Sequence, residues 1–450
     1  MSRRVGRAAK PRRRYAHFVT TTAATERLII RGGHPLRGRI AVSGSKNAAL
    51  YAVAATLLTA EPMTLRNVPA IADIGEMAEL LRDLGASVEV DGEIMRVEAH
   101  IGEKTAADPE RAASLRASFL VMGPLLGRLG EAACAPPGGD VIGSRPLDVH
   151  FAGFRALGAV VQREGPEYVA RASKLRGARI FFDYPSVLGT VNVIFAAVLA
   201  EGMTTIVNAA AEPEVAMACD LLNAMGARIE GGGNNTVRIE GVTSLHGADF
   251  TIIPDRIEAG TYLLAGVATD GDIEVVGAVP DHLDSLVAKL REANVLVEPF
   301  TLPAQASSGR VDVGIRVRRG GRFDAVQLQA VPYPGFATDL HAPMAAALTQ
   351  AHGVSIIHER VYDNRMNYVS ELRFMGARMT TGGQSVMIEG PTALIGTPVR
   401  AHDVRAGAAV VLAALCADGE TTIRDITHID RGYADLDVRL RALGADVSRR

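Results

Sequence analysis

The chain has 450 residues, of which 48% are hydrophobic and 22% charged, with a formal net charge of −2. This composition is ordinary for a globular protein of enzyme size, and the length predicts two or three domains. Tryptophan is absent and aromatic residues make up only 5%, which argues against recognition of single-stranded nucleic acid by base stacking. No run reaches the roughly 18 apolar residues of a membrane span. From these two observations, neither nucleic acid nor a membrane is expected as a partner.

Residues 1–26 are predicted to form a disordered basic arm. Residues 1–25 contain seven basic residues and no acidic one, and a disordered extension is favoured over a nucleic-acid or membrane contact. The arm lacks the apolar segment of a secretory signal, which leaves a transit peptide as the alternative. Cys134, Cys219 and Cys416 lack metal-ligand spacing, and their odd number without a secretion signal predicts reduced thiols in a cytoplasm.

The first predicted helix covers residues 47–58 and follows an unusual polar turn. The sequence Gly-Ser-Lys-Asn-Ala-Ala from Gly44 combines a flexible turn, the cation Lys46 and an amide, Asn47, expected to cap the helix. The free N–H groups and the dipole of such a helix end favour anions. Lys46 is therefore either a phosphate ligand or, like most single lysines, a solvated side chain.

A phrase of the type Leu-Arg-Ala-Leu-Gly-Ala recurs six times, at intervals of 68 to 82 residues. Each copy ends an amphipathic helix with a residue that favours left-handed backbone, namely Gly85, Gly158, Gly226, Asn294, Gly376 and Gly444. Strands are predicted at 87–90, 204–207 and 227–230, and a further small-residue helix at 405–415. Each unit therefore follows the order strand, helix, strand, helix, strand, strand. Units of this size favour compact packing over a solenoid, either as one ring or as two groups of three.

Residues 136–150 form a loop that is better suited to chemistry than to packing. Its prolines and glycines leave little room for regular structure and let the backbone approach a ligand closely. Asp140 lies in the glycine-rich turn, Arg145 follows five residues later, and Asp148 and His150 come just beyond.

Arginines stand near the starts of other predicted helices or loops, at Arg116, Arg365 and Arg405. Arginine at the N-terminal end of a helix opposes the dipole unless an anion binds there. Each arginine alone is more often part of a surface ion pair. Together, in equivalent places of the repeats, they favour a multiply charged phosphate or carboxylate ligand.

Two acidic segments contain Asp255 and Asp339, and each aspartate is either a helix cap or a general base. Residues 316–323 are predicted as a strand that ends in a Gly-Gly turn, in preference to an RGG-like nucleic-acid element. The chain has no G-x-x-x-x-G-K-[ST] phosphate loop and no strand-placed G-x-G-x-x-G, so ATP and NAD have no motif support. Structural or surface roles are favoured for His150, His341 and His428.

Several motifs occur in order along residues 27–447 together with the six repeats. They are Gly-Ser-Lys-Asn-Ala-Ala from Gly44, Leu-Arg-Ala-Ser from Leu115, Pro-Gly-Gly-Asp-x-Ile-Gly-Ser-Arg-Pro-Leu-Asp-x-His from Pro137, Pro-Asp-Arg-Ile-Glu-Ala-Gly-Thr from Pro254, and His-Ile-Asp-Arg-Gly-Tyr from His428. This set resembles the UDP-N-acetylglucosamine enolpyruvyl transferase family. The resemblance implies an inside-out α/β barrel arrangement of two domains, each built of three βαβαββ units. It places residues 46–250, with the loop 136–150, in one domain, and residues 27–45 plus 251–450 in the other.

The resemblance also implies a reaction, the transfer of enolpyruvyl from phosphoenolpyruvate to the 3-hydroxyl of UDP-N-acetylglucosamine with release of phosphate. In the family this is the first committed step of peptidoglycan precursor synthesis, and it implies no cofactor and no metal. The implied catalytic residues are Lys46, Asp140 as the acid on a lid, Asp339 as the base, and Arg405. The implied substrate-binding residues are Asn47, Arg116, Arg145, Pro146, Leu147, Asp148, Val149, Ser186, Val187, Val361 and Arg365.

The chain departs from the family pattern at several positions. Most members carry Cys where this chain has Asp140, and a carboxylate attacks an epoxide poorly, which predicts resistance to fosfomycin. Other departures are Tyr184, Leu188, Ala337, His341 and Pro343, and they place the acceptor in doubt. Two alternatives therefore stay open: an enolpyruvyl transferase acting on another nucleotide acceptor, and a non-catalytic nucleotide-sugar sensor. The sequence predicts no oligomeric state.

Overall fold

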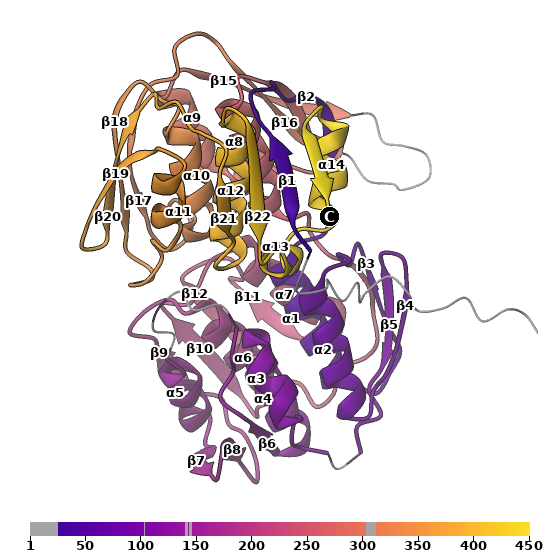
Figure 1. Cartoon of the computed structure of the whole chain (residues 1–450). Coiled ribbons are helices and arrows are strands. Elements are labelled where there is room, and N and C mark those ends of the chain that lie inside the picture. The colour runs from indigo at the N-terminus through magenta and orange to yellow at the C-terminus, as the bar shows by residue number, and fades with distance from the viewer. Residues whose placement is uncertain (1–25, 103, 140–142, 144–145, 303–311) are drawn as a thin grey trace, which may run out of the picture.

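The computed structural model describes residues 26–102, 104–139, 143, 146–302 and 312–450 (Figure 1). The predicted arm, except Glu26, lies outside the described residues, as do Asp140 and Arg145. The described chain forms two groups of elements, called here the lower group and the upper group from their places in Figure 1.

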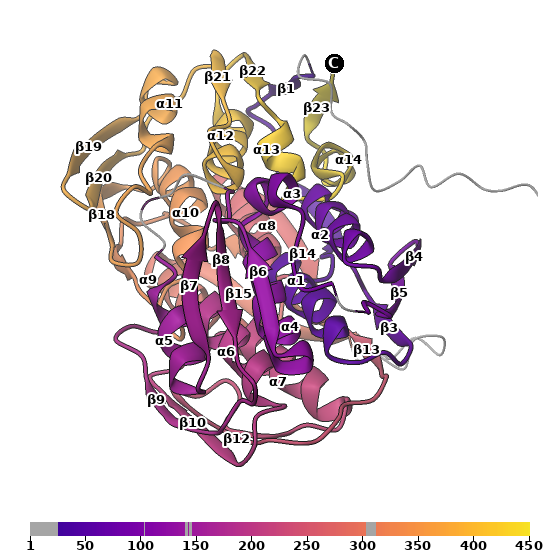
Figure 2. The same ribbon diagram turned by 90° about the horizontal axis from the view of Figure 1, so that it is seen from below.

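The lower group contains three sheets, which Figure 2 shows from below. Their orders are β13-β3-β5-β4, β6-β8-β7 and β11-β12-β10-β9. The strands are β3 (Met63–Arg66), β4 (Ser87–Asp91), β5 (Ile94–Glu98), β6 (Glu131–Cys134), β7 (Val160–Glu164), β8 (Glu167–Arg171), β9 (Arg179–Phe181), β10 (Met203–Val207), β11 (Arg228–Glu230), β12 (Thr236–Glu240) and β13 (Asp249–Thr251). The helices are α1 (Lys46–Ala55), η1 (Thr56–Leu58), α2 (Ala72–Asp83), α3 (Pro109–Ser114), η2 (Arg116–Val121), α4 (Met122–Leu129), α5 (Asp148–Ala156), α6 (Val187–Ala197) and α7 (Pro213–Ala224).

The upper group also contains three sheets, of orders β15-β16-β14-β2, β17-β18-β20-β19 and β21-β22-β1-β23. The strands are β1 (Leu28–Arg31), β2 (Arg37–Ala41), β14 (Asp272–Val276), β15 (Val295–Leu302), β16 (Asp312–Arg319), β17 (Gln327–Ala330), β18 (Gly353–Glu359), β19 (Arg378–Gly382), β20 (Ser385–Gly390), β21 (Pro398–Arg400), β22 (Glu420–Arg424) and β23 (Asp446–Arg449). The helices are α8 (Arg256–Ala268), η3 (Pro280–His282), α9 (Asp284–Glu292), η4 (Thr338–Leu340), α10 (His341–Leu348), α11 (Tyr368–Phe374), α12 (Val404–Cys416), α13 (Thr427–Asp430) and α14 (Leu436–Ala442).

The predicted repeat is confirmed, and it forms two groups of three units. The third unit, for example, runs β9, α6, β10, α7, β11, β12, in the expected order, and its four strands form one sheet. All six turn residues have positive φ, from 63° at Asn294 to 102° at Gly85, as a helix end followed by a reversal requires. The strand at 316–323 is confirmed as well, since β16 ends at Arg319 just before Gly320 and Gly321.

The helices rich in small residues form the interior, with the sheets outside them (Figure 1). Every residue of α10 is buried, and so are all but the last residue of α12 and all but the first residue of α8. The buried apolar residues form two separate clusters. One spans residues 48–252 with Ala434, and the other combines 28–36 with 257–447. An inside-out α/β fold of two halves is therefore confirmed, and we propose 46–250 and 27–45 plus 251–450 as the domain bounds.

The chain passes between the two groups at two adjacent crossings. Strand β2 pairs in parallel with β14 before the chain enters α1, and β13 pairs in parallel with β3 before the chain enters α8. Gly44 and Pro254 form a bridge between the crossings. A side chain at Gly44 would bring its Cβ to 1.7 Å from the carbonyl oxygen of Asn67, so only glycine fits there. The two crossings thus hold each other in place at the junction.

Stability is expected to fall as pH rises from about 4.5 to about 7, because of the buried Glu258 beside the crossings. Its Oε2 accepts a hydrogen bond from the backbone N–H of Ser43 at 2.7 Å, and its Oε1 lies 3.4 Å from Arg439. Burial raises the pKa of Glu258 from 4.5 to about 7, although Arg439 opposes that rise. Between these values the folded protein keeps a proton that the unfolded chain releases, so this contribution is present at low pH and is lost as pH rises.

The Glu258→Gln variant should lose this pH dependence. Thermal unfolding of the native protein and the variant should be measured at about pH 5 and about pH 8. The free energy of unfolding of the native protein, relative to that of the variant, should fall by at most about 3 kcal/mol between the two pH values. A native-minus-variant difference in stability that does not change with pH would contradict the expectation.

The helices of the described part of the chain include none with the length and apolar character of a membrane span.

Candidate active site

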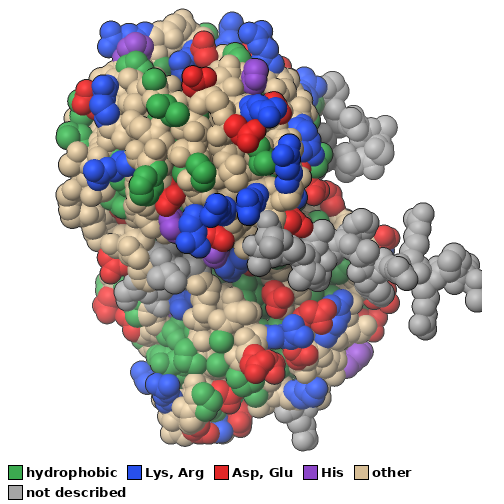
Figure 3. Space-filling view, viewed as in Figure 1, with side chains coloured by type: hydrophobic (Ala, Val, Ile, Leu, Met, Phe, Trp, Pro, Cys, Tyr) green, Lys and Arg blue, Asp and Glu red, His purple; other side chains and the backbone are tan. Residues whose placement is uncertain are grey.

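A cavity of about 320 Å³ lies between the two groups and is lined by both. In Figure 3, lysine and arginine side chains gather along the edge of the upper group that faces the junction. The polar lining of the lower group consists of Lys46, Asn47, Tyr51, Asp73, Arg116, His150, Tyr184, Ser186, Glu212 and Glu214. The polar lining of the upper group consists of Arg256, Tyr333, Thr338, Asp339, Tyr362, Arg365, Arg405 and Arg431.

Lys46 is buried and paired, so the solvated alternative for it is wrong. It lies in the first turn of α1, where its backbone N–H donates to the Asp255 carboxylate at 2.9 Å. Its Nζ lies 2.6 Å from Asp73 Oδ2, and Arg431 Nε donates to the other oxygen of Asp73 at 2.8 Å. Burial raises the pKa of Asp73, but Lys46 and Arg431 lower it to a net value below the ordinary one. Two cations on one carboxylate leave a positive charge for an anionic ligand.

The predicted cap of α1 is wrong in its residue. The side chain of Ser45, not that of Asn47, accepts a hydrogen bond from the N–H of Ala48. Serine is as good an N-cap as asparagine, and its position one residue before Lys46 leaves the Asn47 side chain free to line the cavity. Asp255 is confirmed as a helix cap, since it accepts hydrogen bonds from Ile257 and Glu258 at the start of α8.

Asp339 lies in η4 between two arginines. It pairs closely with Arg365, and its second oxygen accepts from Arg405 at 2.9 Å. Burial raises the pKa of Asp339, but Arg405 and Arg365 hold it well below its usual range. Arg405 enters the site from the first turn of α12, where Asp403 caps the helix, and it also donates to the Tyr433 hydroxyl at 3.3 Å. Asp339 thus pairs with two arginines, and a bound anion can take its place as their partner.

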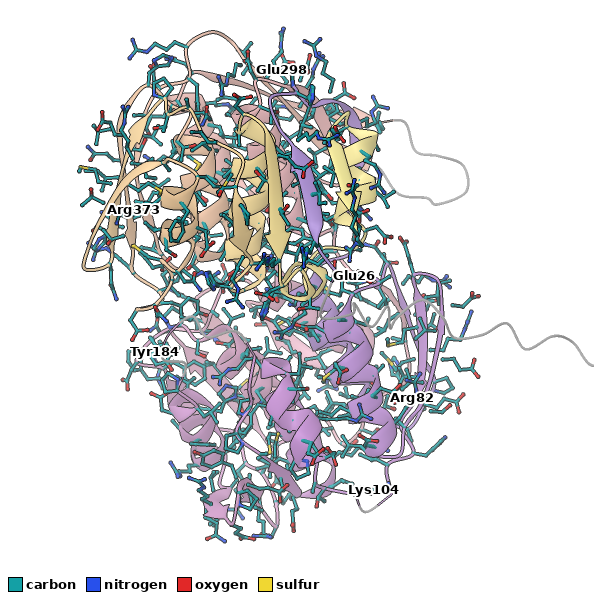
Figure 4. All side chains as sticks on the ribbon, viewed as in Figure 1. Glu26, Arg82, Lys104, Tyr184, Glu298 and Arg373 are labelled. Atoms are coloured by element: carbon teal, nitrogen blue, oxygen red, sulfur yellow. The ribbon has the colours of Figure 1, made fainter. Side chains whose placement is uncertain are left out.

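The loop after Arg145 reaches the cavity only in part within the described residues. Pro146 lines the cavity, whereas Leu147, Asp148 and Val149 do not, and the Val149 side chain is buried in the lower core. Asp148 instead accepts a hydrogen bond from the hydroxyl of Tyr184 at 2.7 Å. Tyr184 lies on the lower group at the level of the junction in Figure 4.

Most other predicted binding residues do meet at the cavity. Among them are Asn47, Arg116, Ser186, Val187, Val361 and Arg365. Ser186 caps α6, accepting from Gly189, so it lies at a helix N-terminus that faces the cavity. Arg116 begins η2 and also lines the cavity. Asp140 and Arg145 lie outside the described residues, so their places stay predictions.

Sequence reasoning missed an acidic corner of the cavity. Arg256 Nε donates to Glu214 at 2.9 Å, and this buried pair joins α8 of the upper group to α7 of the lower group. Burial raises the pKa of Glu212 beside it. Arg256 follows Asp255 within a motif already singled out, but nothing in the sequence connects it to Glu214. Asp73 was missed for the same reason, since its partner Arg431 lies 358 residues away.

The departures from the family pattern fall into two classes. Tyr184, Leu188 and Ala337 line the cavity, where a bound ligand would meet their side chains. His341 and Pro343 belong to the buried helix α10 and do not line it. His341 and His150 are both buried, and His150, which bonds to Asn192 at 2.9 Å, also borders the cavity. His428 is partly buried in α13 and does not line the cavity, so a structural or surface role stays the prediction for these histidines.

Comparison with known proteins settles the family. A family model described as EPSP synthase (3-phosphoshikimate 1-carboxyvinyltransferase) matches residues 30–440. UDP-N-acetylglucosamine 1-carboxyvinyltransferase 3 of Caldanaerobacter subterraneus is 45% identical over 94% of this chain and 99% of its own length. The corresponding protein of Halothermothrix orenii is 44% identical, again over 94% and 99%. The chain belongs to the UDP-N-acetylglucosamine 1-carboxyvinyltransferase family.

Membership of this carboxyvinyltransferase family makes the chain a transferase and confirms the resemblance seen in its motifs. Solved structures agree with the fold. The enolpyruvyl transferase NikO from Streptomyces tendae superposes with a TM-score of 0.83 at 26% identity, covering 94% of this chain and 99% of that one. An EPSP synthase from Acinetobacter baumannii gives a TM-score of 0.73 at 17% identity, covering 95% and 100%, which shows the shared fold alone.

Proposed function

We propose that this carboxyvinyltransferase transfers enolpyruvyl from phosphoenolpyruvate to the 3-hydroxyl of UDP-N-acetylglucosamine and releases phosphate, as a step of peptidoglycan precursor synthesis. The observation that carries the proposal is Asp339 held between Arg365 and Arg405 in a cavity that also contains Lys46 and Arg116. The names and close similarity of the relatives support the choice of substrates.

Phosphoenolpyruvate is a small molecule with a phosphate and a carboxylate, and the cations of the cavity suit both. Lys46 of the lower group and Arg431 of the upper group meet on Asp73, while Arg365 and Arg405, both of the upper group, meet on Asp339. Arginine forks match phosphate and carboxylate oxygens bidentately. We assign these cations to the phosphate and carboxylate of phosphoenolpyruvate, with Arg116 and Arg145.

Asp339 acts as the general base in this proposal. Its low pKa in the free protein reflects its two arginine neighbours. When phosphoenolpyruvate takes up the charge of these arginines, the carboxylate becomes a stronger base, because fewer cations stabilise its ionised form. It then accepts the proton of the acceptor 3-hydroxyl, a transfer that requires the hydroxyl to bind within hydrogen-bond distance of the carboxylate.

The reaction has two stages, an addition and an elimination. In the addition, the acceptor oxygen bonds to C2 of phosphoenolpyruvate while an acid, assigned to Asp140, delivers a proton to C3. In the elimination, the carboxylate left on Asp140 takes a proton back from C3 as the C–O bond to phosphate breaks, which restores the double bond on the product, and the proton held by Asp339 passes to the departing phosphate. The cations stabilise the negative charge of the departing phosphate throughout.

The acceptor is assigned to a wall of the cavity that both groups form. Asn47, Ser186 and Val187 of the lower group and Val361 of the upper group line it, and Arg145, Pro146, Leu147, Asp148 and Val149 are carried over from the family pattern. Leu188 also lines this wall, and its side chain is the reason that another nucleotide acceptor stays the second candidate. The free cysteines, two of them buried, favour a reducing compartment, and we propose the cytoplasm.

Steady-state phosphate release tests the assignment. Phosphoenolpyruvate at saturation with UDP-N-acetylglucosamine should give continuous turnover, whereas UMP and shikimate 3-phosphate should give none. Turnover with UMP but not with the nucleotide sugar would favour the second candidate. Tight binding of the nucleotide sugar without any phosphate release would favour a sensor.

Resistance to fosfomycin is expected, because Asp140 replaces the thiol that this epoxide alkylates in the family. None of the three cysteines, Cys134, Cys219 and Cys416, lines the cavity, and burial raises the pKa of each thiol to about 12. No thiolate is thus available to take over the attack. Preincubation with fosfomycin should leave the activity of the native protein unchanged over time, while the Asp140→Cys variant should be inactivated progressively. Time-dependent inactivation of the native protein, with an adduct on Asp140, would contradict this.

A further inference from the structure

A buried network centred on Glu359 lies directly behind the cavity. Glu359 ends β18 and is 1% exposed, and it accepts four hydrogen bonds. Its Oε2 accepts from the hydroxyl of Thr338 at 2.7 Å and from His341 Nδ1 at 2.9 Å. Its Oε1 accepts from the backbone N–H groups of Val361 at 2.7 Å and Tyr362 at 3.2 Å.

These bonds tie together the two segments that carry the proposed base and its partner. Thr338 and His341 flank Asp339 in the chain, where η4 passes into α10. Val361 and Tyr362 open the segment that leads to Arg365, whose guanidinium lies over the Tyr362 ring at 5.5 Å. One carboxylate therefore sets the distance between both segments, although it does not line the cavity itself.

His341 has a defined hydrogen-bonding state in this network. A carboxylate only accepts, so Nδ1 carries a proton towards Glu359, and Nε2 accepts from the hydroxyl of Tyr368 at 2.9 Å. Burial lowers the pKa of His341, although Glu359 opposes this, and the neutral form with a proton on Nδ1 fits both partners. The side chain is 0% exposed, so any role it has in the reaction is exerted through Glu359.

We propose that His341 is a positioning residue, which through Glu359 fixes the Asp339 and Val361 segments against the acceptor sugar. The inference rests on the proposed function, because it assigns the base and the acceptor wall to those segments. A shift of about 1 Å in a positioned catalytic group can cost on the order of a hundredfold in rate. His341 departs from the family pattern, and in this proposal it affects the acceptor by positioning the wall and not by contact with the ligand.

Three variants separate positioning from simple packing. His341→Leu fills the space but removes both hydrogen bonds. His341→Gln keeps a donor for Glu359 and an acceptor for Tyr368, so it should restore the arrangement. Tyr368→Phe removes only the hydroxyl and serves where His341→Leu fails to fold. The matched control is His358→Leu, since His358 precedes Glu359 on β18 but bonds to Ser385 at 2.6 Å, away from the cavity.

Kinetics with phosphoenolpyruvate and UDP-N-acetylglucosamine, together with thermal unfolding, give the test. His341→Leu should lower kcat about tenfold and raise KM for the nucleotide sugar about tenfold, with KM for phosphoenolpyruvate changed less than about threefold. His341→Gln and the control should stay within about threefold of the native values, and Tyr368→Phe should lie between.

Several results would overturn the inference while leaving the proposed function intact. They are native kinetics in His341→Leu or, where that variant does not fold, in Tyr368→Phe; no recovery in a folded His341→Gln; or equal rises in both KM values. Failure of the native protein to turn over these substrates would instead remove the proposed function, and this inference with it.

Discussion

Replacing Asp339 by asparagine is expected to lower kcat about a thousandfold, as removal of a general base does. Asparagine has the same shape and can still accept a hydrogen bond from one of the two arginines, but it cannot take the proton of the acceptor hydroxyl. KM for phosphoenolpyruvate should stay the same or fall, because the variant removes a negative charge that competes with the substrate for Arg365 and Arg405. Single-turnover and steady-state phosphate release measure both quantities.

A matched control for this variant lies on the surface of the upper group. Asp272 also binds an arginine with both oxygens, Arg316, at 2.8 and 2.7 Å, but it is remote from the cavity. Asp272→Asn should keep native kinetics. An Asp339→Asn protein with kcat within about tenfold of native would show that another group removes the proton.

Replacing Lys46 by methionine is expected to lower kcat/KM for phosphoenolpyruvate on the order of a hundredfold, the value of one or two charge-assisted hydrogen bonds. Methionine keeps the apolar part of the side chain in the first turn of α1 but removes the cation on Asp73. Arg431 then remains on Asp73, so the cavity loses one positive charge where the substrate needs it.

Lys174→Met provides the comparison, because Lys174 lies 2.8 Å from Glu201 in a largely exposed pair. Exposed pairs contribute little, so this variant should retain native kinetics and stability. The account of the phosphate subsite would be wrong if Lys46→Met kept kcat/KM for phosphoenolpyruvate within about threefold of the native value.

Local signals in the sequence were enough to predict the architecture. The six helix-ending turns, from Gly85 to Gly444, follow from the backbone geometry that glycine or asparagine allows, and they marked every unit. Asn294 was informative, because its φ of 63° confirms that the position, and not glycine itself, defines the repeat. Grouping the units into two sets of three depended on the resemblance, since periodicity alone is the same for one ring.

Some residues of the candidate site can be predicted from the sequence, but Asp73, Glu214 and Arg256 cannot, and neither can the pairings. Lys46, Asp339 and Arg405 stand at helix starts, where unusual charges can be recognised from the sequence. That Lys46 binds Asp73, and that Asp339 is shared by two arginines, depends on how the two groups meet across the cavity. Asn47 and Ser45, two residues apart, show that local sequence signals also have a limit. Both residue types are good helix caps, and only the backbone geometry selects Ser45.

The product of the reaction tests the central claim most directly. Phosphoenolpyruvate and UDP-N-acetylglucosamine should be incubated with the protein, and the nucleotide product isolated and examined by mass spectrometry and proton NMR. The account predicts one enolpyruvyl ether, with its vinyl protons present and the linkage at the sugar 3-oxygen, formed in equal amount to phosphate. Recovery of unchanged UDP-N-acetylglucosamine, or of an enolpyruvyl group on any other position, would contradict it.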